Sequence, residues 1–217
     1  VAAFEDNRTL RFKGADTGMS GQDASLRLVG RGAWQFDALA YLQSRDFHNV
    51  VVASSPPYAT TLDQTSTPST GTGAKFEVRP PIGGGHVLRL GGDWRVAQGT
   101  GKETRLVPTP LYRESGGTNS DVGFYAEDDW TIGPIVLTGG ARADRWSIRS
   151  GTFTATSPTG QTVTDLAFAN RAAWAGSFRG GVLLHATSAL DMRAAAYSNI
   201  RQPTLNELYR TFIVSGI

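Results

Sequence analysis

The sequence predicts an all-β protein, an antiparallel transmembrane β-barrel segment, and three observations lead to that prediction. The composition of the chain, with 26 Gly, five Trp and only two Met in 217 residues, is typical of turn-rich β structure. Apolar residues recur at every second position in several segments, which is the period of a strand. The connections between these segments alternate between short and long, as they do at the two ends of a membrane barrel.

Two-residue periodicity predicts eight strands, which pair into four hairpins. In the fourth, Leu88, Leu90 and Trp94 share one face, whereas Arg89 and Arg95 share the other. The eight predicted strands cover residues 25–31, 33–45, 74–81, 86–96, 121–131, 134–146, 171–184 and 189–199.

Alternation alone would also suit a soluble β-sandwich, whose apolar face looks into a core. The apolar face of the sixth predicted strand carries Gly139, Ala141 and Ala143. Such small residues pack a core poorly but make a tolerable lipid-facing surface. This observation favours the barrel over the sandwich.

The connection lengths separate the two folds further. Short turns are expected at residues 30–32, 82–85, 132–134 and 185–188, and long loops at 46–73, 97–120 and 147–169. Loops longer than about 15 residues are uncommon in compact soluble domains. Strict alternation of short turns and long loops is typical of periplasmic turns and extracellular loops.

Tryptophans are placed as in the aromatic girdles of a membrane barrel. Trp34 and Trp130 flank short turns, whereas Trp94 and Trp174 lie near the long-loop ends, and all four share the side of the apolar residues. Asp128 points to the same side as Trp130, and we expect it at headgroup level, where a charge costs little. A soluble protein would instead use such rings to fill a core.

Composition excludes several classes of function. No run of 18 apolar residues is present, so a membrane role requires a barrel and not a helix. Cys is absent, which removes disulfides, thiolate metal sites and cysteine nucleophiles. The net charge of +2 comes from scattered basic residues, which gives no nucleic-acid footprint. The chain opens on Val1 without a signal-peptide pattern, so we expect it to be an internal piece of a longer polypeptide.

No motif predicts catalysis, a metal or a cofactor. His48, His86 and His185 lack the spacing of a metal site or a nucleophile triad, and no serine can be shown to meet His86 as a phospholipase would need. The stretch from Gly99 to Glu103 departs from a phosphate-binding loop and is expected to be a loop tip.

Two phrases of sequence carry a family resemblance. Residues 201–210, RQPTLNELYR, resemble the R-x-P-T-x-x-E-L-Y signature of the outer-membrane β-barrel of TonB-dependent receptors. Residues 123–130, GFYAEDDW, and 137–144, LTGGARAD, are similar to a hairpin of that family, with Glu127 and Ala143 as departures. The matching residues are Tyr125, Asp128, Trp130, Arg142, Asp144, Arg201, Pro203, Thr204, Glu207, Leu208 and Tyr209.

The resemblance implies about eight strands of a 22-stranded barrel, with residues 1–217 forming part of it and the plug domain and remaining strands lying elsewhere. It implies the bacterial outer membrane, contact with its lipid, and active uptake of a scarce nutrient such as a ferric siderophore. The energy would come from the TonB complex acting through the plug. Thr204 and Glu207 also fit a capping box that opens a short helical turn after Pro203.

The charged faces of the strands supply the candidate functional residues. We expect them to line a polar lumen, although each could instead belong to a solvated ladder of ion pairs. They are Arg89, Arg95, Arg142, Asp144 and Arg193. Aromatic and charged residues in the predicted loops suit ligand capture without identifying the ligand; these are Tyr58, Arg105, Tyr112, Arg113 and Glu114.

Two alternatives remain open from the sequence. The chain could form a complete eight-stranded barrel with a structural or adhesive role, because eight strands suffice for closure. It could also be a soluble sugar-binding sandwich, which the loop alternation disfavours.

Overall fold

The computed structural model describes residues 1–210, which form one antiparallel sheet of eleven strands and one short helix. No helix within this range is long and apolar enough to cross a membrane. The strands are β1 (Ala2–Thr9), β2 (Asp16–Arg31), β3 (Gln35–Val52), β4 (Thr60–Ser66), β5 (Ser69–Arg79), β6 (His86–Arg105), β7 (Leu111–Ile132), β8 (Ile135–Thr156), β9 (Thr162–Phe168), β10 (Arg171–Thr187) and β11 (Leu190–Ser198), followed by α1 (Leu205–Tyr209).

The strands form a meander in which chain neighbours are sheet neighbours. The order is β1-β2-β3-β4-β6-β7-β8-β10-β11, while β5 pairs with β3 and β6, and β9 pairs with β8. Strands β4 and β5 both pair with β3, at successive positions, so they act as one interrupted strand. Strands β9 and β10 share β8 in the same way.

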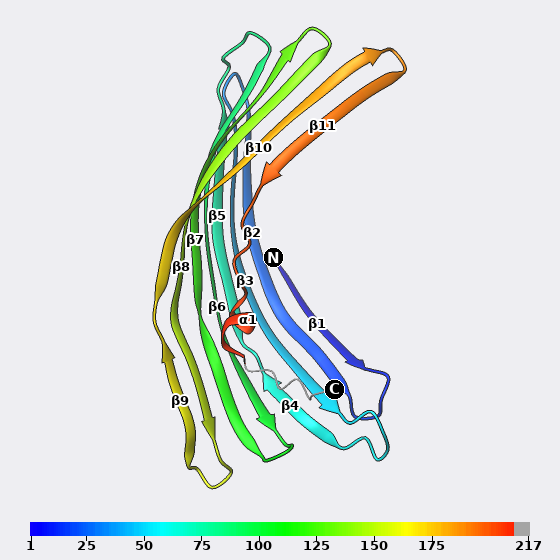
Figure 1. Cartoon of the computed structure of the whole chain (residues 1–217), viewed down its shortest axis with the longest axis vertical. Helices are drawn as coiled ribbons and strands as arrows, with labels where there is room; N and C mark the ends of the chain where they lie inside the picture. The colour runs from blue at the N-terminus through cyan, green and yellow to red at the C-terminus, as the bar shows by residue number, and fades with distance from the viewer. Residues whose placement is uncertain (211–217) are drawn as a thin grey trace.

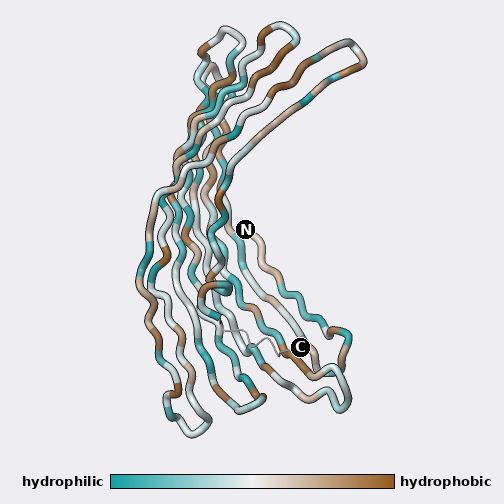
Figure 2. Tube along the Cα trace, viewed as in Figure 1, coloured by the Kyte–Doolittle hydropathy of each residue, from teal (hydrophilic) through white to brown (hydrophobic). Residues whose placement is uncertain are grey.

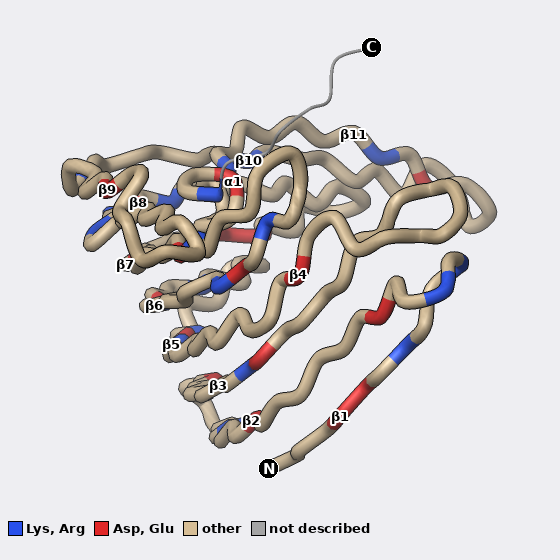
Figure 3. Tube along the Cα trace, turned by 90° about the horizontal axis from the view of Figure 1, so that it is seen from below, with Lys and Arg blue, Asp and Glu red and all other residues tan. Residues whose placement is uncertain are grey.

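The sheet is curved, and its two faces differ in shape. Seen from below, it bends from β1 through β5 and β6 to β10 and β11, with α1 inside the curve (Figure 3). The short turns lie at the top of Figure 1, and the longer connections lie at the bottom, which we call the mouth end. Hydrophobic and hydrophilic residues alternate along the strands (Figure 2), so the two faces also differ in chemistry.

The convex face is apolar and exposed. Phe124 and Phe178 are each about 60% exposed, and Phe36 stacks on Phe76 across β3 and β5 with ring centroids 6.5 Å apart. Large apolar side chains exposed together on one face indicate that a partner or a membrane covers it. Lipid is the partner that an apolar band around a barrel requires.

Tryptophans lie at both ends of this apolar band. Trp94 and Trp174 lie in one cross-strand row, through Val122 and Arg145, on the side toward the mouth. Trp130 lies near the other end of β7, and the eight residues from Val122 to it span about 26 Å along the strand. A barrel's apolar band is about 25 Å tall before any tilt is considered. The spacing of the tryptophans therefore suits a bilayer.

A polar cluster lies on the convex face beside the short turns. The Nδ1 atom of His86 is 2.6 Å from Asp128 Oδ2, and the His86 ring stacks on Trp130 with centroids 5.1 Å apart. Asp128 thus points outward beside Trp130. Its position at the edge of the band is where headgroups can solvate a charge.

The predicted secondary structure is correct in the band and wrong beyond it. Each of the eight predicted strands falls on an observed one, but the long loops at 46–73, 97–120 and 147–169 are largely strand. The mouth-end connections are only residues 10–15, 53–59, 106–110 and 157–161. The strands of the sheet therefore number eleven and not eight within residues 1–210, because β1, β4 and β9 were not predicted.

The residues assigned to loops also need correction. Gly99 to Glu103 lies inside β6 and is not a loop tip, Arg105 ends β6, and Tyr112, Arg113 and Glu114 lie in β7. His185 lies in β10 and not in a turn. Tyr58 does lie in a connection. The mouth-end halves of these strands have polar residues on both faces. They therefore lack the alternation of apolar and polar residues that marks a strand in a sequence.

Candidate functional site: the concave face

The concave face carries a network of charges centred on Arg142 of β8. Its guanidinium donates from Nη1 to Asp93 Oδ2 at 2.6 Å and from Nε to Asp144 Oδ1 at 2.8 Å. Asp121 lies 3.7 Å from Nη2 and also accepts a hydrogen bond from Arg95 at 3.2 Å. The network draws on β6, β7 and β8, which place these residues side by side through their register.

This network is stabilised by mutual pairing of partly desolvated groups. The side chains of Asp121 and Asp144 are only 9% exposed, and that of Arg142 is 25% exposed, whereas Arg95 is 60% exposed. Removing one partner from a desolvated cluster leaves uncompensated charge. Arg142 is therefore the structural centre, and Arg95 is peripheral.

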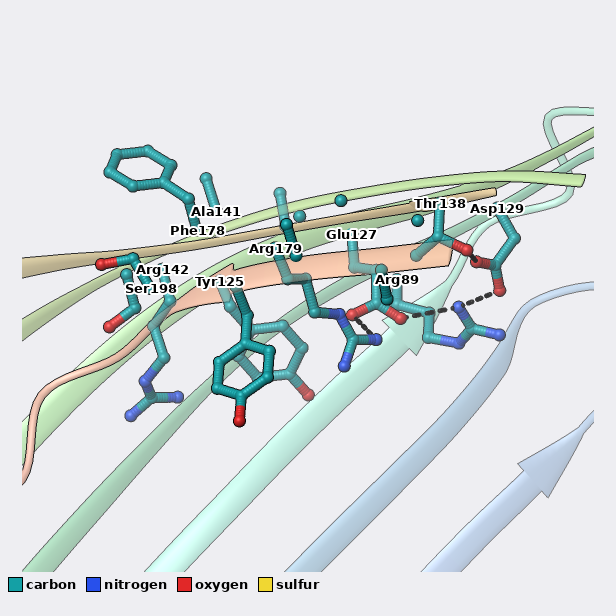
Figure 4. Close-up of a pocket in the computed structure, with 18 of the residues that line it drawn as sticks. Arg89, Tyr125, Glu127, Asp129, Thr138, Ala141, Arg142, Phe178, Arg179 and Ser198 are labelled. Atoms are coloured by element: carbon teal, nitrogen blue, oxygen red, sulfur yellow. Dashed lines mark hydrogen bonds and ion pairs between the residues drawn. The ribbon is translucent and has the colours of Figure 1, made fainter. Parts of the chain in front are cut away.

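A second cluster lies nearer the short turns (Figure 4). Arg89 donates to Glu127 at 3.0 Å and to Asp129 at 2.7 Å, while Thr138 donates to the other oxygen of Asp129 at 2.6 Å. Glu127 also pairs with Arg179 of β10. These groups line a cavity of about 900 Å³ on the concave face.

Tyr125 lies beside Arg142 and lines the same cavity as the second cluster. It lies opposite Arg142 in the register, and its hydroxyl donates to Glu77 Oε2 at 2.6 Å. The Arg142 guanidinium lies 5.9 Å from the Tyr125 ring centroid. The two halves of the hairpin phrase are thus directly paired across β7 and β8, with Tyr125, Arg142 and Asp144 on the concave side.

The five residues predicted to line a polar lumen all lie on the concave face, but they do not all belong to the same cluster. Arg95, Arg142 and Asp144 share the network described above, and Arg89 belongs to the second cluster. Arg193 of β11 lines the same cavity as Arg89 and is exposed. Arg193 makes no hydrogen bond or ion pair with another residue of the range 1–210.

A segment from the far end of the chain returns to this face. Residues 199–210, which we call the re-entrant segment, leave β11 and cross to β7 and β8 inside the curve of the sheet (Figures 1 and 3). Gln202 donates to Asp121 Oδ2 at 2.9 Å, and Asn119 donates to the Pro203 carbonyl at 3.1 Å. The segment thereby attaches directly to the Arg142 network.

The re-entrant segment is folded upon itself by the residues of its sequence phrase. Thr204 caps α1, since its hydroxyl accepts from the Glu207 amide at 3.2 Å and its own amide donates to Glu207 Oε2 at 2.7 Å. This confirms the predicted capping box. Arg201 donates to Glu207 at 2.6 Å, and that bond, with those from Thr204, lowers the pKa of Glu207 to about 2.

Tyr209 anchors the end of this segment in the wall. It is 7% exposed, and its ring lies against Gly117 of β7 and Gly151 of β8, where a Cβ at either position would collide with it. Phe168 covers the ring with centroids 5.0 Å apart. The next residue, Arg210, donates to Glu103 at 3.0 Å, and Glu103 also pairs with Arg113. Leu208 is half-buried beside them.

Within residues 1–210 no group of three or more His, Asp or Glu side chains is arranged to hold a metal ion. What the concave face offers is a broad polar wall of fixed charges, amides and hydroxyls. Such a wall suits binding or passage of a polar molecule.

An apolar convex face, tryptophans at both ends of it and a charged concave face define a segment of a transmembrane β-barrel with a polar interior. The family model described as TonB dependent receptor-like, beta-barrel, matches residues 2–216. The chain therefore belongs to the β-barrel domain of the TonB-dependent receptors, a family of outer-membrane transporters of Gram-negative bacteria and not of enzymes. Neither the comparison with curated proteins nor that with solved structures found a match.

Several functional partners were missed from sequence. Asp93, Asp121 and Glu127 hold the predicted arginines; Asp93 shares the parity of Arg89 and Arg95 in β6, and Asp121 and Glu127 share the parity of Tyr125 in β7. That parity is a signal that could have found them. The attachment of Gln202 to Asp121 carries no comparable signal, because the two residues are far apart in the sequence.

Proposed function

We propose that this chain forms part of an outer-membrane receptor that takes up a scarce nutrient complex such as a ferric siderophore. The observation that carries the proposal is the contrast between the two faces of the sheet. A lipid-facing apolar surface on the convex side and a charged wall on the concave side are what a barrel with an aqueous interior needs. Family membership supplies the receptor and transport role.

We further propose that additional strands complete the barrel. Within residues 1–210, β1 and β11 end the sheet without pairing to each other or to a further strand. An open edge in lipid leaves backbone amides and carbonyls without partners, each at a cost of several kcal/mol. A 22-stranded barrel, as the family resemblance implies, would pair both edges.

In this proposal the concave face surrounds a plug domain contributed by the same receptor. The connections and strand extensions at the mouth end would capture the ligand. The TonB complex would act on the plug to release the ligand. Because the energy would come from that complex, no nucleotide site is needed on this chain. The Arg142 network and the Arg89 cluster would form the fixed side of the channel.

A complete eight-stranded barrel fits the observations less well. The described sheet does not close on itself, and its path runs over nine successive strands with two more aligned alongside. A soluble sandwich fits less well still, because the convex face has no second sheet packed against it within residues 1–210.

Uptake by cells tests the proposal. A deletion of the gene should reduce transport of at least one iron chelate under iron limitation, and the complete gene should restore it only in cells with a working TonB complex. Restoration without TonB would contradict the active-transport role. Unchanged uptake of every iron chelate in the deletion would contradict the siderophore assignment.

A further inference from the structure

An acidic side chain lies on the convex face just inside the tryptophan at the short-turn end. Asp128 precedes Trp130 by two residues in β7, so it lies about 7 Å further into the apolar band before any tilt is considered. Its side chain is 33% exposed. Aromatic side chains mark the headgroup level of a membrane. A charge just inside that level is costly unless a donor or a cation reaches it.

This chain satisfies only part of the Asp128 carboxylate. Oδ2 lies 2.6 Å from His86 Nδ1, whereas Oδ1 is covered and has no hydrogen-bond partner among residues 1–210. An ionised carboxylate can accept about four hydrogen bonds. Its four neighbours on the convex face carry no charge; they are Leu88, Ala126, Trp130 and Gly139. The charge of Asp128 is therefore largely uncompensated, and the exposed edge of its carboxylate is open to a cation from outside the chain.

His86 presents a second acceptor beside this carboxylate. Because Nδ1 lies against Asp128, it donates its proton there, and Nε2 of the neutral imidazole is then an acceptor. The His86 ring stacks on Trp130 with 10° between the ring planes, which fixes its orientation. Aromatic faces also attract cations. A carboxylate, an imidazole nitrogen and an aromatic face together are the chemistry that recognises an ammonium group with N–H donors.

The surface next to Asp128 has room for such a group. The register partner of Asp128 in β8 is Gly139, and the next position across the sheet is Gly180 of β10. A Cβ at Gly139 would meet no atom within 4 Å, and one at Gly180 would meet none closer than 3.9 Å. Leu137 and Val182, in the row nearer the turns, are each 38% exposed. Apolar surface beside the open carboxylate suits a lipid better than a free amine.

We infer that His86, Asp128 and Trp130 bind the headgroup of phosphatidylethanolamine, a zwitterionic phospholipid with a primary ammonium. The ammonium donates to the Asp128 carboxylate and to His86 Nε2, while the acyl chains lie along the apolar band. The short turns place this site in the periplasmic leaflet. An anionic headgroup without an ammonium would instead meet the like charge of Asp128. The site lies on the outside of the barrel, so the inference does not depend on which nutrient the receptor transports.

A second His–Asp pair at the same end of the sheet provides a matched control. His185 Nδ1 lies 2.7 Å from Asp191 Oδ1. These two residues pair across β10 and β11 and share the parity of Leu183 and Arg193, which line the concave cavity. The two pairs therefore have the same chemistry but face opposite sides of the sheet. Only the pair on the convex face would reach lipid.

Native mass spectrometry of the whole receptor, with one phospholipid added at a time, tests the inference. The first molecule of phosphatidylethanolamine should bind at least about fivefold more tightly than that of phosphatidylglycerol, which has no ammonium. Phosphatidylcholine keeps the cation but has no N–H donor, so its affinity should lie between the two. Equal binding of the three lipids would overturn the inference. Displacement of phosphatidylethanolamine by an equal concentration of free ethanolamine would also overturn it, because the site would then take a soluble amine.

Two variants assign the preference to the convex pair. Asp128→Asn should weaken phosphatidylethanolamine binding at least about fivefold and abolish its preference over phosphatidylglycerol. Asp191→Asn removes the same charge on the concave face and should leave both unchanged. A preference that survives Asp128→Asn, or an equal loss in the two variants, would contradict the assignment. The comparison of lipids on the unaltered receptor remains decisive even if Asp128→Asn does not fold.

Discussion

The long strands of this sheet have a band-level half and a mouth-end half, and different interactions stabilise the two. In the half that lies between Trp130 and the row of Trp94 and Trp174, the convex face is apolar and the concave face is charged, so lipid and water define the two sides. In the mouth-end half, both faces are polar, yet this half holds the most buried apolar residues, Ile148, Phe153 and Ala155. The first half is organised by the membrane, and the second is organised by packing against the re-entrant segment and neighbouring strands.

The largest expected difference between the halves concerns a charge on the convex face. Ala141 lies in the band and Ala172 lies beyond Trp174, and both are exposed on that face. Ala141→Arg should lower the free energy of unfolding by about 2–4 kcal/mol, whereas Ala172→Arg should cost about 0–1 kcal/mol. Denaturant unfolding of the receptor in bilayers measures both, and equal costs would show that Ala141 does not face lipid.

The second prediction separates the centre from the periphery of the concave network. Arg142→Ala should destabilise the receptor by about 3 kcal/mol, because three partly buried aspartates lose their shared partner. Arg95→Ala should cost less than about 1 kcal/mol, because Arg95 is mostly exposed. Unfolding measurements on the two variants check this order, and the reverse order would contradict the assignment of Arg142 as the centre.

The third prediction concerns the mouth-end half. Tyr209→Ala removes the ring that fills the space over Gly117 and Gly151, so the re-entrant segment should open more often. Hydrogen exchange of amides in residues 199–210 should accelerate at least about tenfold, while exchange in the band-level parts of β7 and β8 stays the same. Tyr209→Phe keeps the ring and should show little change. Acceleration throughout β7 and β8 would show that the two halves are not separate.

The smallest expected effect is a dependence on pH within the re-entrant segment. The pKa of Glu207 is lowered from 4.5 to about 2, so its contribution to stability is complete above about pH 4.5 and is lost as the pH falls through 2. Amide exchange of α1, corrected for the intrinsic pH dependence, should therefore reveal loosening between pH 4.5 and 2. Glu207→Gln should remove that change. A transition that persists in Glu207→Gln would assign it to another group.

The difference between the band-level half and the mouth-end half explains how much of the fold could be predicted from the sequence. Alternation identified all eight band-level strands and placed Arg89, Arg142 and Arg193 on one side, because lipid imposes a period of two on the sequence. The mouth-end halves of β6, β7 and β8 were assigned to loops, because neither of their faces meets lipid and no such period arises.

The re-entrant segment marks the other limit. Its capping box was predicted, since Thr204 and Glu207 interact at a fixed short spacing. Its attachment to Asp121 and the space for Tyr209 over two glycines depend on contacts between distant strands. Local sequence carries no signal for such contacts.

The central claim is that the convex face contacts lipid and the concave face contacts water, and accessibility along β8 tests it most directly. The chain has no Cys, so single cysteines at positions 136 to 141 can carry a spin label one at a time. Labels at Leu137, Gly139 and Ala141 should be relaxed mainly by oxygen dissolved in lipid, and labels at Val136, Thr138 and Gly140 mainly by a water-soluble paramagnet. Equal access of the water-soluble reagent to both sets would contradict the account.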